Sequence, residues 1–369
     1  MIYLDNNATT PIDERVLDAM LPFLKNYYGN ASSLYRLGRL SRTAIDIARG
    51  QVAALVDIRS EQVIFTSGGT EANNLALTAL PPQAKLAISA IEHPSVTEPA
   101  LQLKNKGHGL SIIAVDSSGY IMQEAIDGLL QCPPALVSIM LANNETGVVQ
   151  DVARYAGQLR AHGVKVHTDA VQALAKMPVS FKRLGVQLMS LSSHKIYGPK
   201  GCGALVVEKG TAIAPVLLGG GQEQELRAGT ENVAAIVGFG KAAELAKLEL
   251  DARTEYLLKL RCLLEQNLET IPGLMLFSRD ANRLPNTVQF GIHGMDGEML
   301  LMRLDQKSIA VSSGSACASS GGKPSPVLTA MAMDEALAKS AIRISLGKTN
   351  TEVEVIQFIN VLKSLLCQV

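Results

Sequence analysis

Short apolar runs alternate with stretches of helical periodicity from the N-terminus to about Thr230. We expect β-strands at residues 62–66, 85–89, 111–115, 135–141, 164–168, 186–192 and 203–207. These runs are rich in Val, Ile and Leu and carry few charges, which is typical of strands covered on both faces. Helical periodicity precedes or separates them at residues 37–57, 70–80 and 151–162. The alternation predicts an α/β fold around a mostly parallel, seven-stranded sheet.

The pattern changes after Thr230. Residues 232–270 show a long helical periodicity with mixed charges, which predicts one kinked helix or two, and Pro272-Gly273 ends it. A smaller α+β unit is then expected from residues 286–292, 297–305, 308–311, 326–333, 341–346 and 351–366. We expect the boundary between the two units near residues 235–260, inside the helical segment, so no flexible linker is needed.

The composition excludes several classes of protein. Of the 369 residues, 47% are apolar and 18% are charged, which is enough apolar material for a large core. The 34 basic and 34 acidic residues leave no net charge, and only 4% are aromatic, which argues against a dedicated nucleic-acid binder. We expect no membrane span, because the sequence lacks a sufficiently long apolar run, and no secretory signal at the N-terminus.

Five cysteines are scattered along the chain, at positions 132, 202, 262, 317 and 367. No two of them form a Cys-x-x-Cys pair, so we expect neither a zinc ribbon nor a thioredoxin motif, and no metal site. An odd number of cysteines in a large chain without a secretory signal predicts a reducing compartment, the cytoplasm.

The segment from Ser67 to Glu71 is the first candidate site, because its glycines follow an apolar run and open a helical one. Glycine lets the backbone approach a ligand closely, and the first turn of a helix offers N–H groups and a positive dipole end. These properties predict an anion site, most simply for a phosphate. An ordinary strand-to-helix turn is the alternative for this segment on its own.

Asp169 and Lys195 each follow a later apolar run, at the edge of the sheet where ligands of α/β proteins bind. Taken alone, Asp169 is as easily a helix cap, and Lys195 an exposed loop residue. Together with a phosphate site, however, they satisfy the needs of pyridoxal 5′-phosphate. The carboxylate keeps the pyridine nitrogen protonated, and the lysine forms the Schiff base.

Two further polar residues belong to the same edge. Gln172 lies one helical turn beyond Asp169, and His93 follows another apolar run. His93 is therefore a candidate to stack on the cofactor ring. A structural role is the alternative for a single histidine.

Cys317 lies in a run of small residues, 312–322, that has no apolar periodicity. This composition predicts a mobile loop that presents a reactive thiol rather than a buried structural cysteine. Arg343 interrupts the apolar run 341–346. Its guanidinium is a candidate to clamp a substrate carboxylate bidentately, and a solvent-facing strand residue is the alternative.

These segments, taken in order, resemble the cysteine desulfurases of the NifS/IscS type. The matching motifs span nearly the whole chain: YLDNNATTP, GNASS, TSGGTEANN, EHPSV, NNETGVVQ, HTDAVQ, SSHKIYGPKG, GGGQEQELRAGTENV, SSGSAC and IRISLG. The SSGSAC motif separates this group from general aminotransferases. The resemblance implies a fold type I pyridoxal-phosphate enzyme of the class V aminotransferase group that acts as a homodimer. It also implies a large cofactor-binding domain over residues 15–250 and a small domain formed by residues 1–14 and 251–369.

The resemblance further implies roles for individual residues around the cofactor. Lys195 matches the Schiff-base lysine, Asp169 the partner of the pyridine nitrogen, and Gln172 the hydrogen-bond partner of the phenolic oxygen. His93 is expected to stack on the ring and assist proton transfer, and Asn144 to lie near the cofactor and substrate. The phosphate is expected to be held by Gly69, Thr70, Ser192 and His194, and by Thr230 of the partner subunit.

The same resemblance implies the reaction. Arg343 is expected to bind the carboxylate of L-cysteine and Cys317 to accept its sulfur, which gives L-alanine and an enzyme persulfide. The acceptor of that sulfur is expected to be a protein such as an iron–sulfur scaffold or a tRNA-thiolation protein. Selenocysteine lyase or another class V aminotransferase is the alternative. Residues 321–326 read GGKPSP where the family has an acidic residue followed by Pro-Ser, a departure that concerns loop geometry and partner docking rather than the chemistry.

Overall fold

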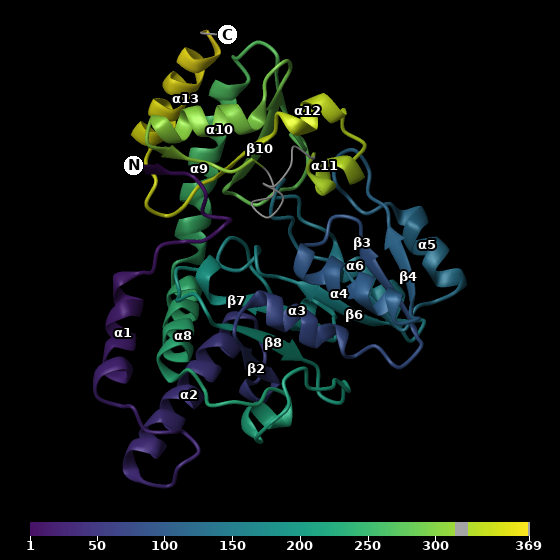
Figure 1. Ribbon diagram of the computed structural model, residues 1–369, viewed down its shortest axis with the longest axis vertical. Helices are drawn as coiled ribbons and strands as arrows, with labels where there is room; N and C mark the ends of the chain where they lie inside the picture. The colour runs from purple at the N-terminus through teal and green to yellow at the C-terminus, as the bar shows by residue number, and fades with distance from the viewer. Residues whose placement is uncertain (314–323, 368–369) are drawn as a thin grey trace.

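Seven strands form the central sheet of the computed structural model, which describes residues 1–313 and 324–367 (Figure 1). From one edge to the other, they are β2 Val63–Thr66, β8 Gly203–Val207, β7 Leu188–Ser192, β6 Lys165–Asp169, β5 Leu136–Ser138, β3 Lys85–Ser89 and β4 Gly109–Ile113. β8 runs antiparallel to both of its neighbours, and the remaining pairs are parallel. The predicted α/β fold with a mostly parallel, seven-stranded sheet is therefore confirmed.

One predicted strand is displaced along the chain. The strand expected at residues 111–115 lies at Gly109–Ile113, because the ladder with β3 fixes its register there. Val115 instead forms an isolated antiparallel bridge with Ile121. The predicted range extended too far because Val115, just beyond the end of the strand, is also apolar.

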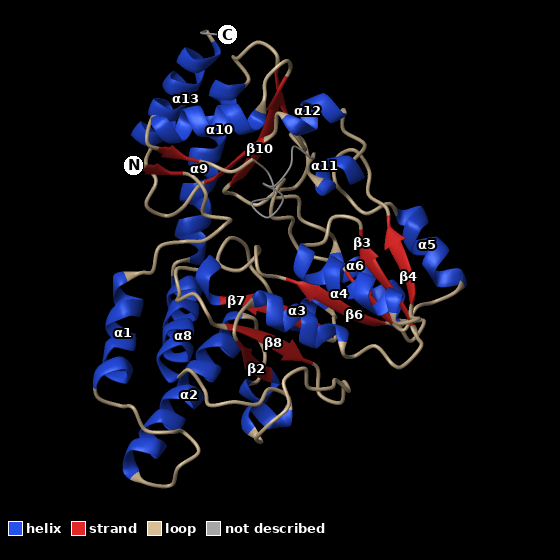
Figure 2. Cartoon of the chain, in the orientation of Figure 1, coloured by secondary structure: helices blue, strands red, loops and turns tan. Residues whose placement is uncertain are grey.

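Helices cover both faces of the sheet (Figure 2). Those of the first 250 residues are α1 Glu14–Lys25, α2 Arg36–Leu55, α3 Gly69–Leu77, α4 Pro94–Asn105, α5 Gln123–Gln131, α6 Val152–Arg160, α7 Phe181–Leu184 and α8 Val233–Leu248. α3 and α4 cover one face, and α2, α5, α6 and α8 cover the other. In β2, Ile64 packs on the first face, and its neighbours Val63 and Phe65 pack on the second. Burial on both faces is why the strands read as continuous apolar runs.

The long helical segment predicted at residues 232–270 is two helices. α8 ends at Leu248, and α9 runs from Leu250 to Leu268. The break at Glu249 lets α8 pack on the sheet while α9 joins a second apolar core. Among the described residues, none of the helices combines the length and apolar character that a bilayer crossing needs.

The second core lies at the top of Figure 1, together with both ends of the chain. The remaining elements are β1 Ile2–Tyr3, β9 Leu274–Leu276, β10 Thr287–Ile292, α10 Gly297–Gln306, β11 Ile309–Ala310, α11 Pro326–Ala330, α12 Glu335–Lys339, β12 Ile342–Ser345 and α13 Glu352–Leu366. β1 belongs to this unit because Ile2 pairs with Ile309. The apolar side chains of α11 and α12 pack instead with the sheet-domain core, as Val327 and Leu337 do. We propose a large domain over 15–250 and a small domain formed by 1–14 and 251–369.

Candidate active site

The carboxyl ends of β6 and β7 and the start of α3 open into one cavity of about 420 Å³. The lining residues that the sequence predicted are Gly69, Thr70, His93, Asn144, Asp169, Gln172, Ser192, His194, Lys195 and Arg343. Thr230 is exposed and is not among the lining residues. Cys317, with the loop mobility predicted around it, lies outside the described residues.

A crowded glycine and a buried hydroxyl form one end of the cavity. α3 begins at Gly69, so the N–H groups of its first turn have no acceptors within the helix. A Cβ at Gly69 would lie only 3.1 Å from Val171 Cγ2 and 3.6 Å from Ser192 Cβ. Ser192 Oγ is buried and has no hydrogen-bond partner in the described part of the chain. N–H groups, a close backbone approach and an unsatisfied hydroxyl together suit a bound phosphate.

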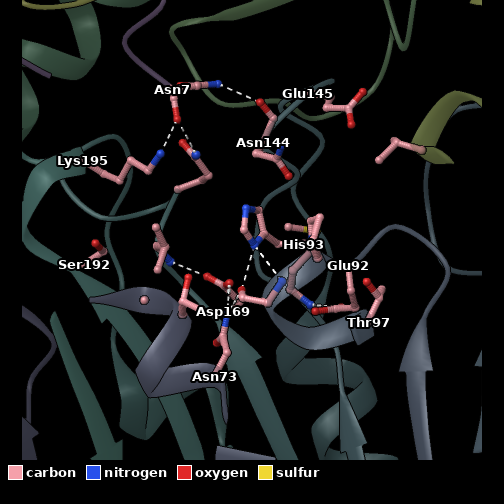
Figure 3. Close-up of a pocket in the computed structure, with 18 of the residues that line it drawn as sticks. Asn7, Asn73, Glu92, His93, Thr97, Asn144, Glu145, Asp169, Ser192 and Lys195 are labelled. Carbon is pink, nitrogen blue, oxygen red and sulfur yellow. Dashed lines mark hydrogen bonds between the residues drawn. The ribbon is translucent and has the colours of Figure 1, made fainter. Parts of the chain in front are cut away.

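Asp169 ends β6, and both of its carboxylate oxygens are fixed by donors. Oδ1 accepts from Val171 N at 2.9 Å, and Oδ2 accepts from Asn73 Nδ2 at 2.7 Å. The side chain is buried beside the cavity (Figure 3). A buried carboxylate held in one orientation can pair with a protonated ring nitrogen.

His93 caps α4 and is held as a neutral imidazole. Ser95 N donates to His93 Nδ1 at 3.1 Å, so the ring proton lies on Nε2. Ser95 Oγ lies 2.7 Å from the same nitrogen and accepts from Asn73 Nδ2 at 2.8 Å, which links the imidazole to Asp169. Burial lowers the pKa of His93, the charge of Asp169 opposes this shift, and Lys195 adds to it.

Lys195 ends a short 3-10 turn that directly follows β7. Its Nζ donates to the main-chain oxygen of Asn7 at 2.6 Å (Figure 3). It also donates to the main-chain oxygen of Ala8 at 2.6 Å. These acceptors belong to the N-terminal segment, which reaches the sheet edge where Thr10 N donates to His194 O. The lysine is therefore oriented by backbone that enters the site from the small unit.

His194 lines the cavity next to this lysine. Its Nδ1 lies 3.1 Å from Thr9 Oγ1. Burial lowers the pKa of His194 to about 4, and the charges of Lys195 and Lys200 act in the same direction. The imidazole is therefore neutral at pH 7, and it can meet an anion as a hydrogen-bond donor rather than as a cation.

Arg343 lies in β12 and is only 2% exposed, so the solvent-facing alternative is wrong. Its Nη2 donates to Asp5 Oδ1 at 2.7 Å, and its Nη1 donates to Asn144 O at 3.0 Å. The Nε–H has no hydrogen-bond partner among the residues that the structure describes. A buried guanidinium with unused donor capacity at a cavity wall suits a substrate carboxylate.

Glu92 is a buried carboxyl of the cavity wall that sequence reasoning missed. Its Oε1 accepts from Ser89 Oγ and Met140 N, each at 2.6 Å, and its Oε2 accepts from Ser138 Oγ at 3.5 Å. Burial raises the pKa of Glu92 to about 7. The donated hydrogen bonds oppose this shift, and the charge of Asp169 adds to it.

We expect the Glu92→Gln variant to stabilise the cofactor-free protein more at about pH 8 than at about pH 5. The folded-state pKa of about 7 exceeds the ordinary 4.5, so the wild type loses stability as the pH rises between these values. Glutamine does not ionise, so the variant does not lose stability in this way. Its side-chain oxygen can still accept hydrogen bonds from Ser89 and Met140. Urea unfolding should give a difference between the two pH values of about 1–3 kcal/mol.

A matched change at Glu98, which is exposed on α4, is the control for this experiment. Glu98→Gln should give the same small effect at both pH values. An equal gain for Glu92→Gln at both pH values would show that Glu92 titrates normally in the folded state.

The family of the chain follows from its similarity to known proteins. Residues 2–358 match the family model described as Aminotransferase class-V. The chain belongs to the class-V aminotransferase family. Cysteine desulfurase IscS of Dictyoglomus turgidum is 42% identical over 371 residues, covering 99% of this chain and 94% of the relative.

Solved structures agree with this membership. The NifS-like protein from Rickettsia africae is 36% identical with a TM-score of 0.92, over 100% of this class-V chain and 99% of the other. SspA, in a structure in complex with cysteine, is 29% identical with a TM-score of 0.82, over 94% of this chain and 99% of the other. The likeness therefore covers both the sheet domain and the small unit.

Several residues that line the cavity, or that bond to residues lining it, were not predicted from the sequence: Asn7, Asn73, Glu92 and Glu145 in the lining, and Asp5 and Lys176 behind it. Asn73 lies one helical turn after Gly69, and that spacing could have placed it at the cavity. No local pattern marks Asn7, since it reaches the site through a segment far from the sheet strands in sequence. Buried carboxyls such as Glu92 were missed because an acidic residue in a sequence ordinarily indicates a solvent-exposed position.

Proposed function

We propose that this protein is a cysteine desulfurase, which removes sulfur from L-cysteine and gives L-alanine and a persulfide on Cys317. The observation that carries the proposal is one cavity lined by Asp169, Lys195 and Arg343, in a chain 42% identical to a cysteine desulfurase. Selenocysteine lyase and another class V aminotransferase are the less favoured alternatives, because the similar proteins are named for cysteine desulfuration.

The site supports pyridoxal 5′-phosphate as the cofactor. The crowded Gly69 and the unsatisfied Ser192 Oγ make a phosphate cradle, with Thr70 and His194 beside it. Asp169 is the carboxylate for the pyridine nitrogen. When bound, pyridoxal phosphate supplies an electron sink that acidifies the α-proton of an amino acid.

The remaining chemistry belongs to side chains of the protein. Lys195 binds the cofactor covalently and, as a free amine, moves the α-proton of the substrate at its Nζ. His93 carries a proton on Nε2 and is the second group able to transfer one. Asn144 and Arg343 hold the substrate carboxylate, and Gln172 is the partner of the cofactor's phenolic oxygen.

Sulfur transfer is a displacement at the substrate sulfur. The Cys317 thiolate attacks that sulfur, an S–S bond forms, and the C–S bond breaks. The electron pair of the broken bond stays on the carbon that becomes the alanine methyl group, which then takes up a proton. The persulfide stays on the enzyme, and no outside oxidant is needed.

We expect Arg343→Ala to lower kcat/KM for L-cysteine by roughly 30- to 1,000-fold while the protein retains bound pyridoxal phosphate. A charge-assisted bidentate pair is worth about 2–4 kcal/mol, and no phosphate contact involves this residue. Arg343→Lys is the control, because it keeps the charge without the planar fork and should lose less activity. Unchanged steady-state kinetics for Arg343→Ala would mean that another group binds the carboxylate.

We also propose a homodimer. Thr230 of the partner subunit would then complete the phosphate site, which is consistent with its exposed position away from the cavity of its own chain. The persulfide sulfur goes to an acceptor protein such as an iron–sulfur scaffold or a tRNA-thiolation protein. The cytoplasmic location stays a prediction from the cysteine pattern.

The proposal is tested by product analysis with a reductant present. L-cysteine should yield alanine and sulfide in equal amounts. Turnover of L-selenocysteine alone would support a selenocysteine lyase, and a 2-oxo acid in place of alanine would support an aminotransferase.

A further inference from the structure

Lys176 is a buried lysine that none of the roles above uses. It follows Gln172 by one helical-type turn, its residue is 6% exposed, and no ion pair of the described residues includes it. Its Nζ donates to Asn7 Oδ1 at 2.9 Å and to Gln172 Oε1 at 2.8 Å. Burying a charged amine between two amide oxygens, without a carboxylate partner, would cost free energy, so this burial needs an explanation.

The surroundings of Lys176 favour the neutral form of its amine, and that form can be buried at this position. Burial lowers its pKa well below the ordinary value, and the positive charges of Lys195 and Arg343 act in the same direction. A neutral amine has two N–H donors, and Lys176 has two acceptors, one on Asn7 and one on Gln172. In its neutral form, the amine is therefore satisfied by these two acceptors without a counter-ion.

This arrangement fixes the amide of Gln172 from two sides. Lys176 donates to Oε1, while Nε2 donates to the main-chain oxygen of Asn7 at 3.0 Å. A carbonyl oxygen only accepts, so the amide cannot turn over without placing two acceptors against each other at Asn7. One N–H of Nε2 remains, and Gln172 lines the cavity. Gln172 therefore presents an N–H donor to the cavity, rather than its carbonyl oxygen.

We propose that Lys176 is a positioning residue that holds Gln172 so that its remaining N–H is offered to the phenolic oxygen of bound pyridoxal phosphate. The inference rests on the proposed function, from which it takes the cofactor. Lys176 also bonds the side chain of Asn7, whose main-chain oxygen orients Lys195. Without Lys176, the buried Oε1 of Gln172 has no donor in the described part of the chain, and the side chain turns away to find one.

The test is a pH titration of the visible absorbance of the cofactor-loaded Lys176→Met protein. A donor to the phenolic oxygen favours its ionised form, so losing that donor should raise the pH midpoint by roughly 0.3 to 1. Methionine is similar in length and needs no hydrogen bond, so the thermal midpoint of the cofactor-free variant should stay equal or rise. A purely structural lysine would give the opposite pair of results, a lower thermal midpoint and an unmoved absorbance midpoint.

Gln172→Leu tests whether Lys176 acts through Gln172. This variant should raise the absorbance midpoint at least as much, and Lys176→Met added to it should raise it no further. Asn286→Ala is the matched control, because Asn286 Nδ2 donates to the same Asn7 oxygen at 3.0 Å without touching Gln172. It should leave the midpoint unmoved.

Two results would overturn the inference. The first is that Gln172→Leu raises the absorbance midpoint while Lys176→Met leaves it at the wild-type value. The second is that the double variant raises the midpoint by the sum of the two single effects. If Lys176→Met does not fold, Lys176→Gln takes its place, with part of the rise expected and an unchanged midpoint contradictory. A wild-type protein that shows no cofactor absorbance at all would overturn the proposed function and the inference with it. That outcome is visible before any variant is made.

Discussion

Lys195→Ala is expected to lower alanine formation from L-cysteine by at least about 1,000-fold, because one change removes both roles proposed for this residue, the covalent partner of the cofactor and a proton-transfer group. The visible absorbance of the bound cofactor should change with it. The cofactor itself should stay bound, since the phosphate cradle of Gly69, Thr70 and Ser192 is untouched. Turnover, absorbance and cofactor content after gel filtration measure these three effects separately.

Lys200→Ala is the control for Lys195→Ala. Lys200 lies five positions further along the chain, is exposed and does not line the cavity. Its substitution therefore removes a nearby positive charge without changing the cavity wall. It should keep nearly full activity. Native turnover in Lys195→Ala would move the covalent role to another lysine and would undo the assignment of the site.

Cys317→Ser is expected to reduce alanine and sulfide production to background while cofactor and substrate binding persist. A hydroxyl is close in size to a thiol but is neither ionised nor a good sulfur nucleophile at neutral pH. In the proposed function, binding rests on Asp169, Lys195 and Arg343, which this change leaves alone. Product analysis, together with the spectral change on adding L-cysteine, separates the two halves of the reaction.

The other cysteines make poor substitutes for Cys317. None of the four that the structure describes lines the cavity, and three of them, Cys132, Cys262 and Cys367, are exposed. The fourth, Cys202, is buried, and burial raises the pKa of its thiol. Cys132→Ser is therefore a suitable control that should keep native activity. A native rate in Cys317→Ser would mean that the sulfur acceptor lies elsewhere.

The described residues on either side of the cysteine segment contact residues of the cavity wall, in keeping with the role proposed for Cys317. On one side, Ser312 N donates to Arg343 O at 3.2 Å. On the other, Ser325 Oγ donates to Glu145 Oε2 at 2.5 Å. Arg343 and Glu145 both line the cavity, so the chain departs from and returns to the cavity wall on either side of the cysteine segment.

The sheet and the strand-end residues could be predicted because both follow from local patterns. An apolar run buried on two faces marks a strand such as β8, whose predicted and observed bounds agree. Polar residues at the end of such runs or within a turn of it, as Asp169 and Lys195 are, reach the same sheet edge by topology alone. The resemblance to a known family then supplied their roles.

The rest depends on contacts between distant segments, which no local pattern encodes. Asn7 comes to the cavity only because the N-terminal strand joins the small unit, at Ile2 and Ile309, before the chain crosses to the sheet. Lys176 reads as an ordinary surface lysine in the sequence. It is a buried amine only because Asn7 and Gln172 surround it with oxygens.

A single-turnover reaction without reductant tests the central claim most directly. Cofactor-loaded protein is mixed with L-cysteine, free alanine is counted, and thiols are alkylated before peptide mass analysis. Cysteine desulfuration predicts one alanine per chain and, on the peptide that carries Cys317, a modification heavier by one sulfur atom than the alkylated thiol. Alanine formed with no extra sulfur on that peptide, or extra sulfur on a different cysteine, would contradict the assignment of Cys317 as the sulfur acceptor.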